Sequence, residues 1–182
     1  MKNSWKKIST EIISRNNWWS YFVDKYNGVG KNKKQVREYH YVHTNGSSLI
    51  IPIDKEGKII LVEQYRYLNK KNSIEFPCGG VKEGNTFLQT AEIELQEETK
   101  FKSKSLKLIG KFNPFNGVTD EVCNVFIAKE LSNSFLKSDE TEEFVLLKYY
   151  PEEVDLLIST GKIWDGMTIA AWQIYKCYLG SK

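Results

Sequence analysis

The stretch GGVKEGNTFLQTAEIELQEETKF, residues 79–101, decides the fold of this chain. A glycine-rich segment opens it, and from Phe87 to about Thr99 the residues favour a helix. Thr86–Gln89 matches a capping box, in which the threonine hydroxyl accepts the N–H three residues on and the glutamine reaches back. Three apolar residues recur at helical spacing and predict one apolar side: Leu88, Ala91 and Leu95.

Three glutamates stand at i, i+3 and i+4 on the expected helix: Glu94, Glu97 and Glu98. This spacing puts Glu97 and Glu98 within ~5–6 Å of Glu94 on one broad face. A solvated acidic surface would explain the cluster taken alone. The glycine-rich loop, however, lets the backbone approach a ligand closely, and Mg²⁺ prefers carboxylate and phosphate oxygens. Together they favour a site that neutralises a pyrophosphate and activates a water.

The stretch resembles the signature of the Nudix hydrolases: glycine, five residues, glutamate, seven residues, arginine-glutamate, an aliphatic residue, any residue, two glutamates, any residue, glycine and an aliphatic residue. Six positions agree at the required spacing: Gly79, Glu94, Leu95, Glu97, Glu98 and the apolar Phe101. Three depart: Asn85 replaces glutamate, Ile93 replaces arginine and Lys100 replaces the second glycine.

The missing arginine is the departure with the largest consequence. In the family it helps to hold the catalytic loop and a glutamate in place, and the Ile93 side chain can form neither a hydrogen bond nor an ion pair. Because the glutamates are intact, the resemblance implies retained, weakened or altered chemistry. The alternative is a nucleotide-binding module that has kept the fold and lost turnover.

The flanking segments resemble the ADP-ribose pyrophosphatase branch. Leu61–Arg66 looks like the strand before the signature, and Ile74–Gly79 resembles an E-x-P-A-G segment with Cys78 in place of alanine. The family uses the backbone carbonyl at that position as a metal ligand, a role that survives the change. The resemblance implies that Glu75 contacts substrate and that Arg66, with its bidentate donors, clamps a phosphate. A surface salt bridge is the alternative for Arg66.

Further segments downstream extend the resemblance. Pro114–Glu121 resembles a P-x-P-G-x-S-D-E loop, and Gly161–Thr168 matches a G-x-I-x-D-x-x-T pattern. Asp139–Phe144 resembles the acidic loop that carries a catalytic base and a further metal contact in this branch. By position, the resemblance implies Glu140 as the base and Glu142 as the metal contact. A charged surface loop is the alternative.

Elsewhere the residue pattern is dominated by strands, which predicts an α+β domain. Strands are expected at Lys7–Ile13, Trp18–Tyr26, Val36–Thr44, Ser47–Asp54, Lys58–Arg66, Ile74–Phe76, Ser105–Phe112, Val122–Leu131 and Phe144–Tyr150. Asp54–Gly57 is expected to form a hairpin turn. Two more helices are expected, one from Pro151 to about Ser159 and one over about Met167–Tyr178.

The resemblance implies the Nudix fold, a mixed β-sheet sandwiched between α-helices, with an N-terminal antiparallel sheet. We expect residues 1–45 to form this N-terminal sheet, which dimerises, and residues 46–182 to form the hydrolase domain. Trp18, Trp19 and Tyr39 are candidates for stacking on the base, since a π-face suits a nucleobase. Sheet packing or a dimer contact explains each of them at least as well.

The activity implied is divalent-metal-dependent hydrolysis of the pyrophosphate of a nucleoside diphosphate sugar. ADP-ribose, cut to AMP and ribose 5-phosphate, is the leading substrate; another nucleotide sugar such as GDP-mannose is the alternative. Mg²⁺ or Mn²⁺ would be held by the carbonyl of Cys78 and the carboxylates of Glu94, Glu97 and Glu98. Glu97 is also placed among the catalytic residues.

Composition narrows the class of protein. The 182 residues carry a net charge of +3 with lysines scattered along the chain, which does not call for nucleic-acid or membrane binding. The N-terminal residues Met1–Trp18 contain no uninterrupted apolar run, so we expect neither a signal peptide nor a membrane span. The 3 cysteines are far apart in the sequence, and no C-x-x-C motif occurs. This pattern argues against a disulfide framework or a structural zinc site, and it favours a reducing cytoplasm.

Overall fold

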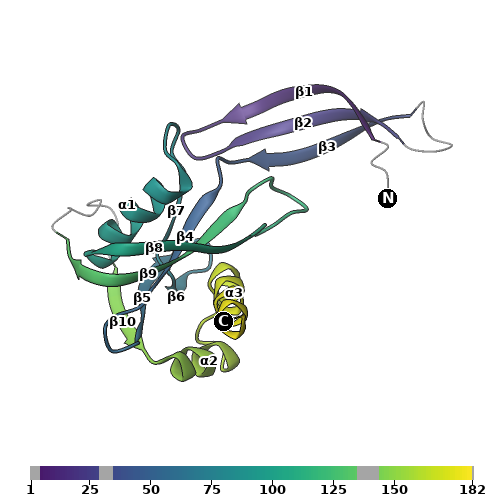
Figure 1. Ribbon diagram of the computed structural model, residues 1–182. Coiled ribbons are helices and arrows are strands. Elements are labelled where there is room, and N and C mark those ends of the chain that lie inside the picture. The colour runs from purple at the N-terminus through teal and green to yellow at the C-terminus, as the bar shows by residue number, and fades with distance from the viewer. Residues whose placement is uncertain (1–4, 29–34, 135–143, 182) are drawn as a thin grey trace. The chain divides into compact units, whose positions relative to one another are not determined.

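The computed structural model describes residues 5–28, 35–134 and 144–181 (Figure 1). The chain divides into two compact units. The first comprises Met1–Asn45 together with Phe115–Glu121, and the second comprises Gly46–Pro114 together with Val122–Lys182. Because the loop 115–121 belongs to the first unit, the boundary is crossed three times by the chain.

The first unit is an antiparallel three-stranded sheet. Its strands are β1 (Lys6–Arg15), β2 (Ser20–Asn27) and β3 (Val36–His43), paired in the order β1-β2-β3. The expected start of the second strand at Trp18 is wrong. Asn16 accepts the backbone N–H groups of Trp18 and Trp19 on its side-chain oxygen, at 2.8 and 2.9 Å, so both tryptophans belong to the turn before β2.

The second unit is built on a four-stranded mixed sheet. Its strands are β4 (Ser47–Pro52), β7 (Cys78–Gly80), β8 (Phe101–Phe112) and β9 (Cys123–Asn133), in the order β7-β4-β9-β8. β4 runs parallel to β9 and antiparallel to β7, and β8 is antiparallel to β9.

Helices cover both faces of this mixed sheet, as Figure 1 shows for α1 (Phe87–Thr99) and α3 (Gly166–Gly180). The alternation of side chains along β4 explains the sandwich. Leu49 and Ile51 belong to the core cluster that contains Trp172 of α3. Ile50, between them, belongs to the cluster that contains Ala91 and Leu95 of α1. The expected α+β architecture with a mixed sheet between helices is confirmed.

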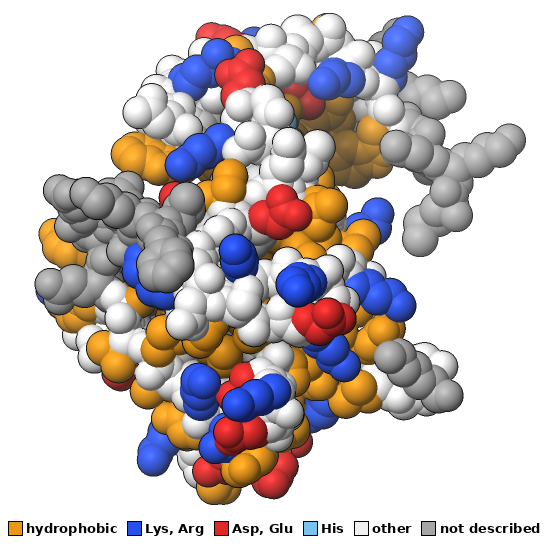
Figure 2. All heavy atoms as spheres, turned by 60° about the vertical axis from the view of Figure 1, so that its left-hand side comes forward, with side chains coloured by type: hydrophobic (Ala, Val, Ile, Leu, Met, Phe, Trp, Pro, Cys, Tyr) orange, Lys and Arg blue, Asp and Glu red, His pale blue; other side chains and the backbone are white. Residues whose placement is uncertain are grey.

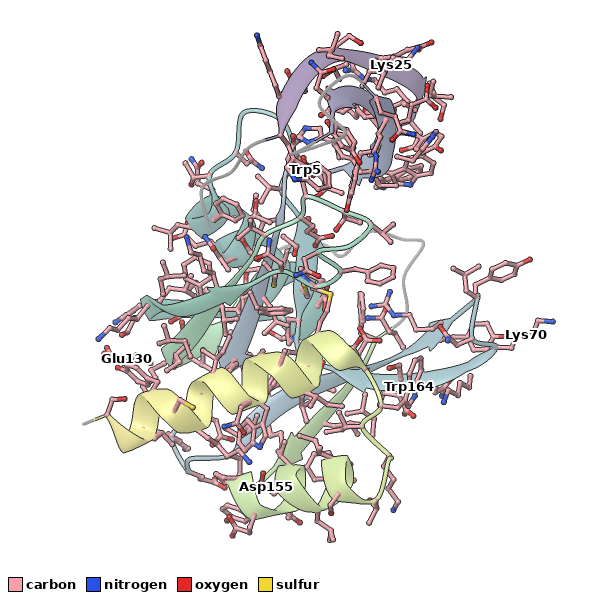
Figure 3. All side chains as sticks on the ribbon, turned by 90° about the vertical axis from the view of Figure 1, so that its right-hand side faces the viewer. Trp5, Lys25, Lys70, Glu130, Asp155 and Trp164 are labelled. Carbon is pink, nitrogen blue, oxygen red and sulfur yellow. The ribbon has the colours of Figure 1, made fainter. Side chains whose placement is uncertain are left out.

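A second, antiparallel sheet completes this unit. It contains β5 (Ile59–Arg66), β6 (Lys71–Glu75) and β10 (Val145–Tyr149), in the order β10-β5-β6. The helix α2 (Pro151–Ser159) follows β10, with the expected bounds. Figure 3 shows Lys70 at the far end of the β5–β6 hairpin and Asp155 on α2.

The turn expected at Asp54–Gly57 is present, but the strands on either side of it, β4 and β5, do not pair as a hairpin. The N–H of Gly57 donates to the carbonyl of Asp54 at 3.0 Å, but only the bridge between Ile53 and Ile59 joins the two flanking strands. β4 then enters the mixed sheet and β5 enters the other sheet. Burial explains the separation, because residues 47–52 and 59–62 are buried on both faces.

Three further expectations need correction. Leu88 is exposed rather than on the apolar side of α1, where the buried residues are Thr90, Ala91, Leu95, Glu98 and Thr99. β6 begins at Lys71 and β8 at Phe101, both earlier than expected, because pairing with β5 and β9 extends these strands into segments made mostly of polar residues. The short strand β7 was not expected, because two of its three residues are glycines.

Candidate active site

The helix α1 begins where the capping box predicts. The N–H of Gln89 donates to the Thr86 hydroxyl at 3.2 Å, and the N–H of Thr86 donates to the Gln89 side-chain oxygen at 2.9 Å. The helix ends at Lys100, whose φ of 61° is left-handed and whose N–H donates to the Gln96 carbonyl at 3.0 Å. The signature has a glycine where this chain has Lys100. The left-handed backbone explains that preference, because glycine adopts such a conformation without steric cost.

The three signature glutamates differ in burial. Glu98 is 7% exposed, whereas Glu94 and Glu97 are half-buried. The backbone N–H of Cys78 donates to Glu98 Oε1 at 3.4 Å. A buried carboxylate is costly unless polar groups or a cation compensate it, so Glu98 fits a position that a cation shares.

Gly79 lies against the carboxylate of Glu94. A Cβ added at Gly79 would stand 2.2 Å from Cδ and from Oε1 of Glu94. Pairing of β7 with β4 holds this backbone in place, with Ser48 opposite Gly79 and Leu49 opposite Cys78. Since real Cβ atoms do not approach other atoms so closely, the signature glycine is explained by lack of space beside a glutamate.

The thiol of Cys78 is kept neutral. A hydrogen bond with the Cys123 side chain, burial, and the negative charges of Glu98 and Glu94 together raise the pKa of Cys78 well above its ordinary value. A cation would need the thiolate to bind through sulfur. The backbone carbonyl of Cys78, which needs no deprotonation, is therefore the better ligand at this position.

Arg66 and Glu75 are bound to each other. Arg66 donates from Nε to Glu75 Oε1 at 2.8 Å and from its second guanidinium nitrogen to Oε2. The hydrogen bond to Glu75 raises the pKa of Arg66 against the effect of partial burial, and the charges of Asp165 and Glu98 add to it. Glu75 is 5% exposed and the Arg66 side chain 45% exposed, so the guanidinium retains a solvent-accessible side for an anionic ligand.

The G-x-I-x-D-x-x-T pattern ties the start of α3 to the segment before β7. Asp165 accepts the N–H of Thr168 at 2.7 Å, and the buried Thr168 hydroxyl accepts the N–H of Phe76 at 3.1 Å. Trp164, which lies alongside the β5–β6 hairpin in Figure 3, donates from its indole N–H to the Asn72 carbonyl at 3.1 Å. The contact between Thr168 and Phe76 was not predicted from the sequence, because the two residues are 92 positions apart.

The predicted site residues fall into three groups. The second unit holds Arg66, Glu75, Cys78, Glu94, Glu97 and Glu98. The first unit holds Trp18, Trp19 and Tyr39, which are 78%, 42% and 42% exposed. The Tyr39 hydroxyl donates to the Gly117 carbonyl at 3.0 Å within that unit. Glu140 and Glu142 lie outside the described residues.

The residues around Gly79 fit a hard divalent cation by their chemistry. Carboxylates approach the Cys78–Gly79 backbone from α1, and carboxylate and carbonyl oxygens are the ligands that Mg²⁺ accepts. Among the described residues, no His, Cys, Asp and Glu side chains form a ready-made group of three around one point.

Comparison with known proteins finds a matching family model and several similar proteins. The NUDIX domain family model matches residues 43–166. The chain is 32% identical over 130 residues to the ADP-ribose pyrophosphatase of Bacillus subtilis (strain 168), covering 70% of each protein. It is 31% identical over 141 residues to the methanol dehydrogenase activator of Bacillus methanolicus, covering 76% of each.

Two further matches extend over nearly the full length. The chain is 27% identical to the GDP-mannose pyrophosphatase of Yersinia pestis (strain Pestoides F), covering 92% of this chain and 89% of that protein. The crystal structure of an ADP compounds hydrolase superposes with a TM-score of 0.83 at 19% identity, covering 97% of this chain and 95% of that one. At this identity the structural match shows a shared fold.

Proposed function

Because this chain belongs to the Nudix family, we propose that it hydrolyses the pyrophosphate of a nucleoside diphosphate sugar in a divalent-metal-dependent reaction. The substrate that we propose is ADP-ribose, with AMP and ribose 5-phosphate as products. The approach of Glu94 and Glu98 to the Cys78–Gly79 backbone is the observation that carries this proposal.

Each residue of the proposed site has a chemical role. The carboxylates of Glu94, Glu97 and Glu98 and the carbonyl of Cys78 would hold Mg²⁺ or Mn²⁺. When bound, such a cation neutralises phosphate charge and lowers the pKa of a water. We count Glu97 among the catalytic residues because it would hold the cation that activates the water. Glu140 as base and Glu142 as an additional metal contact keep the roles that the family resemblance gives them.

Arg66 is proposed to bind a phosphate oxygen of the substrate. Its guanidinium is already oriented by the two hydrogen bonds that it donates to Glu75, so little side-chain freedom remains to be lost on binding. The hydrogen bond to Glu75, to which the charges of Asp165 and Glu98 add, raises the pKa of Arg66, so the side chain offers a permanent positive charge to a phosphate. Glu75 then acts by holding Arg66 as well as by any contact of its own with substrate.

GDP-mannose is the second candidate substrate. The GDP-mannose pyrophosphatase of Yersinia pestis matches 92% of this chain, against 70% for the ADP-ribose pyrophosphatase of Bacillus subtilis, although at lower identity. The two substrates differ in the base as well as in the sugar, and we propose Trp18, Trp19 and Tyr39 as stacking candidates for the base. Because all three are exposed, each has a ring surface open to a ligand.

We further propose that the protein is a homodimer of the cytoplasm. The sheet of the first unit and the turn before β2 expose these large apolar side chains: Trp5, Ile8, Ile12, Ile13, Trp18, Trp19, Val36 and Tyr39. Such a surface is typical of one that pairs with another chain. Free cysteines, with Cys177 exposed, agree with a reducing compartment.

Two observations bear on other partners. None of the described helices is both long and apolar enough to cross a membrane. On the face that Figure 2 presents, lysines and arginines are interspersed with acidic and apolar side chains rather than gathered into a basic tract. A small-molecule substrate is therefore favoured over a nucleic acid.

The test is turnover of the purified protein on ADP-ribose, GDP-mannose, other nucleotide sugars and dinucleoside polyphosphates. Phosphate released by a coupled phosphatase is measured with Mg²⁺ and then with Mn²⁺. Glu98→Gln should abolish turnover. Glu92→Gln, an exposed glutamate on the same helix, is the matched control and should retain it. Absence of turnover on every substrate, with nucleotide binding still measurable, would refute the proposed hydrolysis.

A further inference from the structure

Ser48 connects the two parts of the proposed metal site. It lies on β4, fully buried, and its hydroxyl donates to the carbonyl of Phe87 at 2.7 Å. In the β4–β7 ladder the residue opposite Ser48 is Gly79. The Ser48 side chain therefore links two elements. One is the β4–β7 pair, which carries Gly79, and the other is the first residue of α1, the helix that carries Glu94.

The capping box restrains the same helix end from the loop side. Thr86 and Gln89 exchange two backbone-to-side-chain hydrogen bonds, at 3.2 and 2.9 Å. A capped first turn resists fraying. If the first turn frayed, the residues that follow it on the helix would no longer be held in place. The start of α1 is thus held by hydrogen bonds from both the sheet and the preceding loop.

We propose that Ser48, Thr86 and Gln89 are positioning residues that hold the start of α1 at a set distance from β7. In doing so they place the carboxylates of Glu94 and Glu98 for the bound cation. This inference rests on the proposed function. It adds three residues that act through the placement of α1 rather than as ligands of the cation.

The need for such restraint follows from two features. The space between Gly79 and the Glu94 carboxylate is too small for a Cβ, so a shift of the helix along its axis by even one residue, ~1.5 Å, would change the site. In addition, the two charged positions of the signature that precede Glu94 are occupied by Asn85 and Ile93, which carry no charge. Neutral hydrogen bonds are therefore the restraints that this chain offers at the helix start.

The first experiment compares Ser48→Ala with Ser73→Ala. Both serines are fully buried on strands, but the Ser73 hydroxyl has no hydrogen-bond partner among the described residues. We measure Mn²⁺ affinity by electron paramagnetic resonance without nucleotide, and kcat and KM for ADP-ribose. Ser48→Ala should weaken Mn²⁺ binding and lower kcat by ~10-fold, as expected for one lost hydrogen bond, with KM nearly unchanged. Ser73→Ala should leave both as in the wild type.

The second experiment tests the capping box by rescue. Thr86→Ala should lower kcat and Mn²⁺ affinity by ~5-fold, whereas Thr86→Ser keeps the accepting hydroxyl and should retain both. The same substitution is then made in a chain carrying Asn85→Glu and Ile93→Arg. If the charged positions of the signature restrain the same helix, the loss caused by Thr86→Ala should be smaller there.

The outcomes separate this inference from the proposed function. Equal kcat and Mn²⁺ affinity in Ser48→Ala and Ser73→Ala, with an active wild type, would overturn the positioning role alone. An inactive wild type that binds Mn²⁺ would refute the hydrolysis, and the Mn²⁺ affinities of the variants would then decide the positioning role. Amide hydrogen exchange in the first turn of α1 supplies a third measurement that needs neither cation nor substrate, and unchanged exchange in both Ser48→Ala and Thr86→Ala would overturn it as well.

Discussion

Substitution of Gly79 by alanine should separate activity from stability. The new Cβ would lie 2.2 Å from the Glu94 carboxylate, and ordinary contact begins at 3.4 Å. The carboxylate must therefore retreat by about 1.2 Å, a displacement of the size that costs ~100-fold in rate when a catalytic group is misplaced. This corresponds to ~2.7 kcal/mol of transition-state stabilisation. The fold should lose less than ~1 kcal/mol, because the displaced atoms end a flexible side chain and alanine restricts the unfolded chain.

The assay measures kcat/KM for ADP-ribose with Mg²⁺, together with urea unfolding. Gly80→Ala is the matched control, because a Cβ at Gly80 meets no heavy atom within 4 Å. Gly79→Ala should lose activity with nearly the same unfolding midpoint as the wild type, and Gly80→Ala should match the wild type in both. If the two alanine variants have the same kcat/KM, the reasoning that Gly79 spaces Glu94 is refuted.

Three other predictions concern stability and reactivity. Lys100→Gly should raise the free energy of unfolding by ~1 kcal/mol, because glycine adopts the left-handed φ of 61° without strain, and a urea melt showing destabilisation would contradict this. The hydrogen bond from Lys176, followed by that from the Trp172 indole, lowers the pKa of Asp155, so its ionised form contributes stability above the unfolded pKa that is lost as the pH falls through the folded one. Since Asp155 and Lys176 are both exposed, Asp155→Asn should cost only ~0.5 kcal/mol at pH 7, and thermal melts should show the difference shrinking as the pH falls below the ordinary aspartate pKa of about 4. Iodoacetamide followed by mass spectrometry should label the exposed Cys177 well before the buried Cys123, and equal rates would show that the core opens.

Local structure was the part of this protein most accessible from sequence. The capping box at Thr86–Gln89, the helix Phe87–Thr99 and the helix Pro151–Ser159 all have the predicted bounds. Each depends on contacts between residues a few positions apart, which the residue order displays directly. The error at Leu88 has a tertiary cause, because the face of α1 that is buried depends on where β4 and β9 lie.

Pairing between distant segments was not accessible in the same way. The parallel ladder of β4 with β9 joins residues 47–52 to residues 123–128, and the sequence between them contains four other strands and a helix. The separation of β4 from β5 after a correctly expected turn shows the same limit. A turn determines where the chain reverses, whereas burial on both faces decides which neighbours each strand takes.

For the candidate site, the amino-acid sequence by itself determined the chemistry: which residues bear carboxylates, where the backbone lacks a side chain, and which signature positions have lost their charge. Only the tertiary structure decided which of these groups meet. It brings Gly79 against Glu94, pairs Arg66 with Glu75, and joins Ser48 to the start of α1. The physical reason is that side-chain chemistry belongs to each residue alone, whereas a distance between atoms of distant residues is set by the packing of all the elements that carry them.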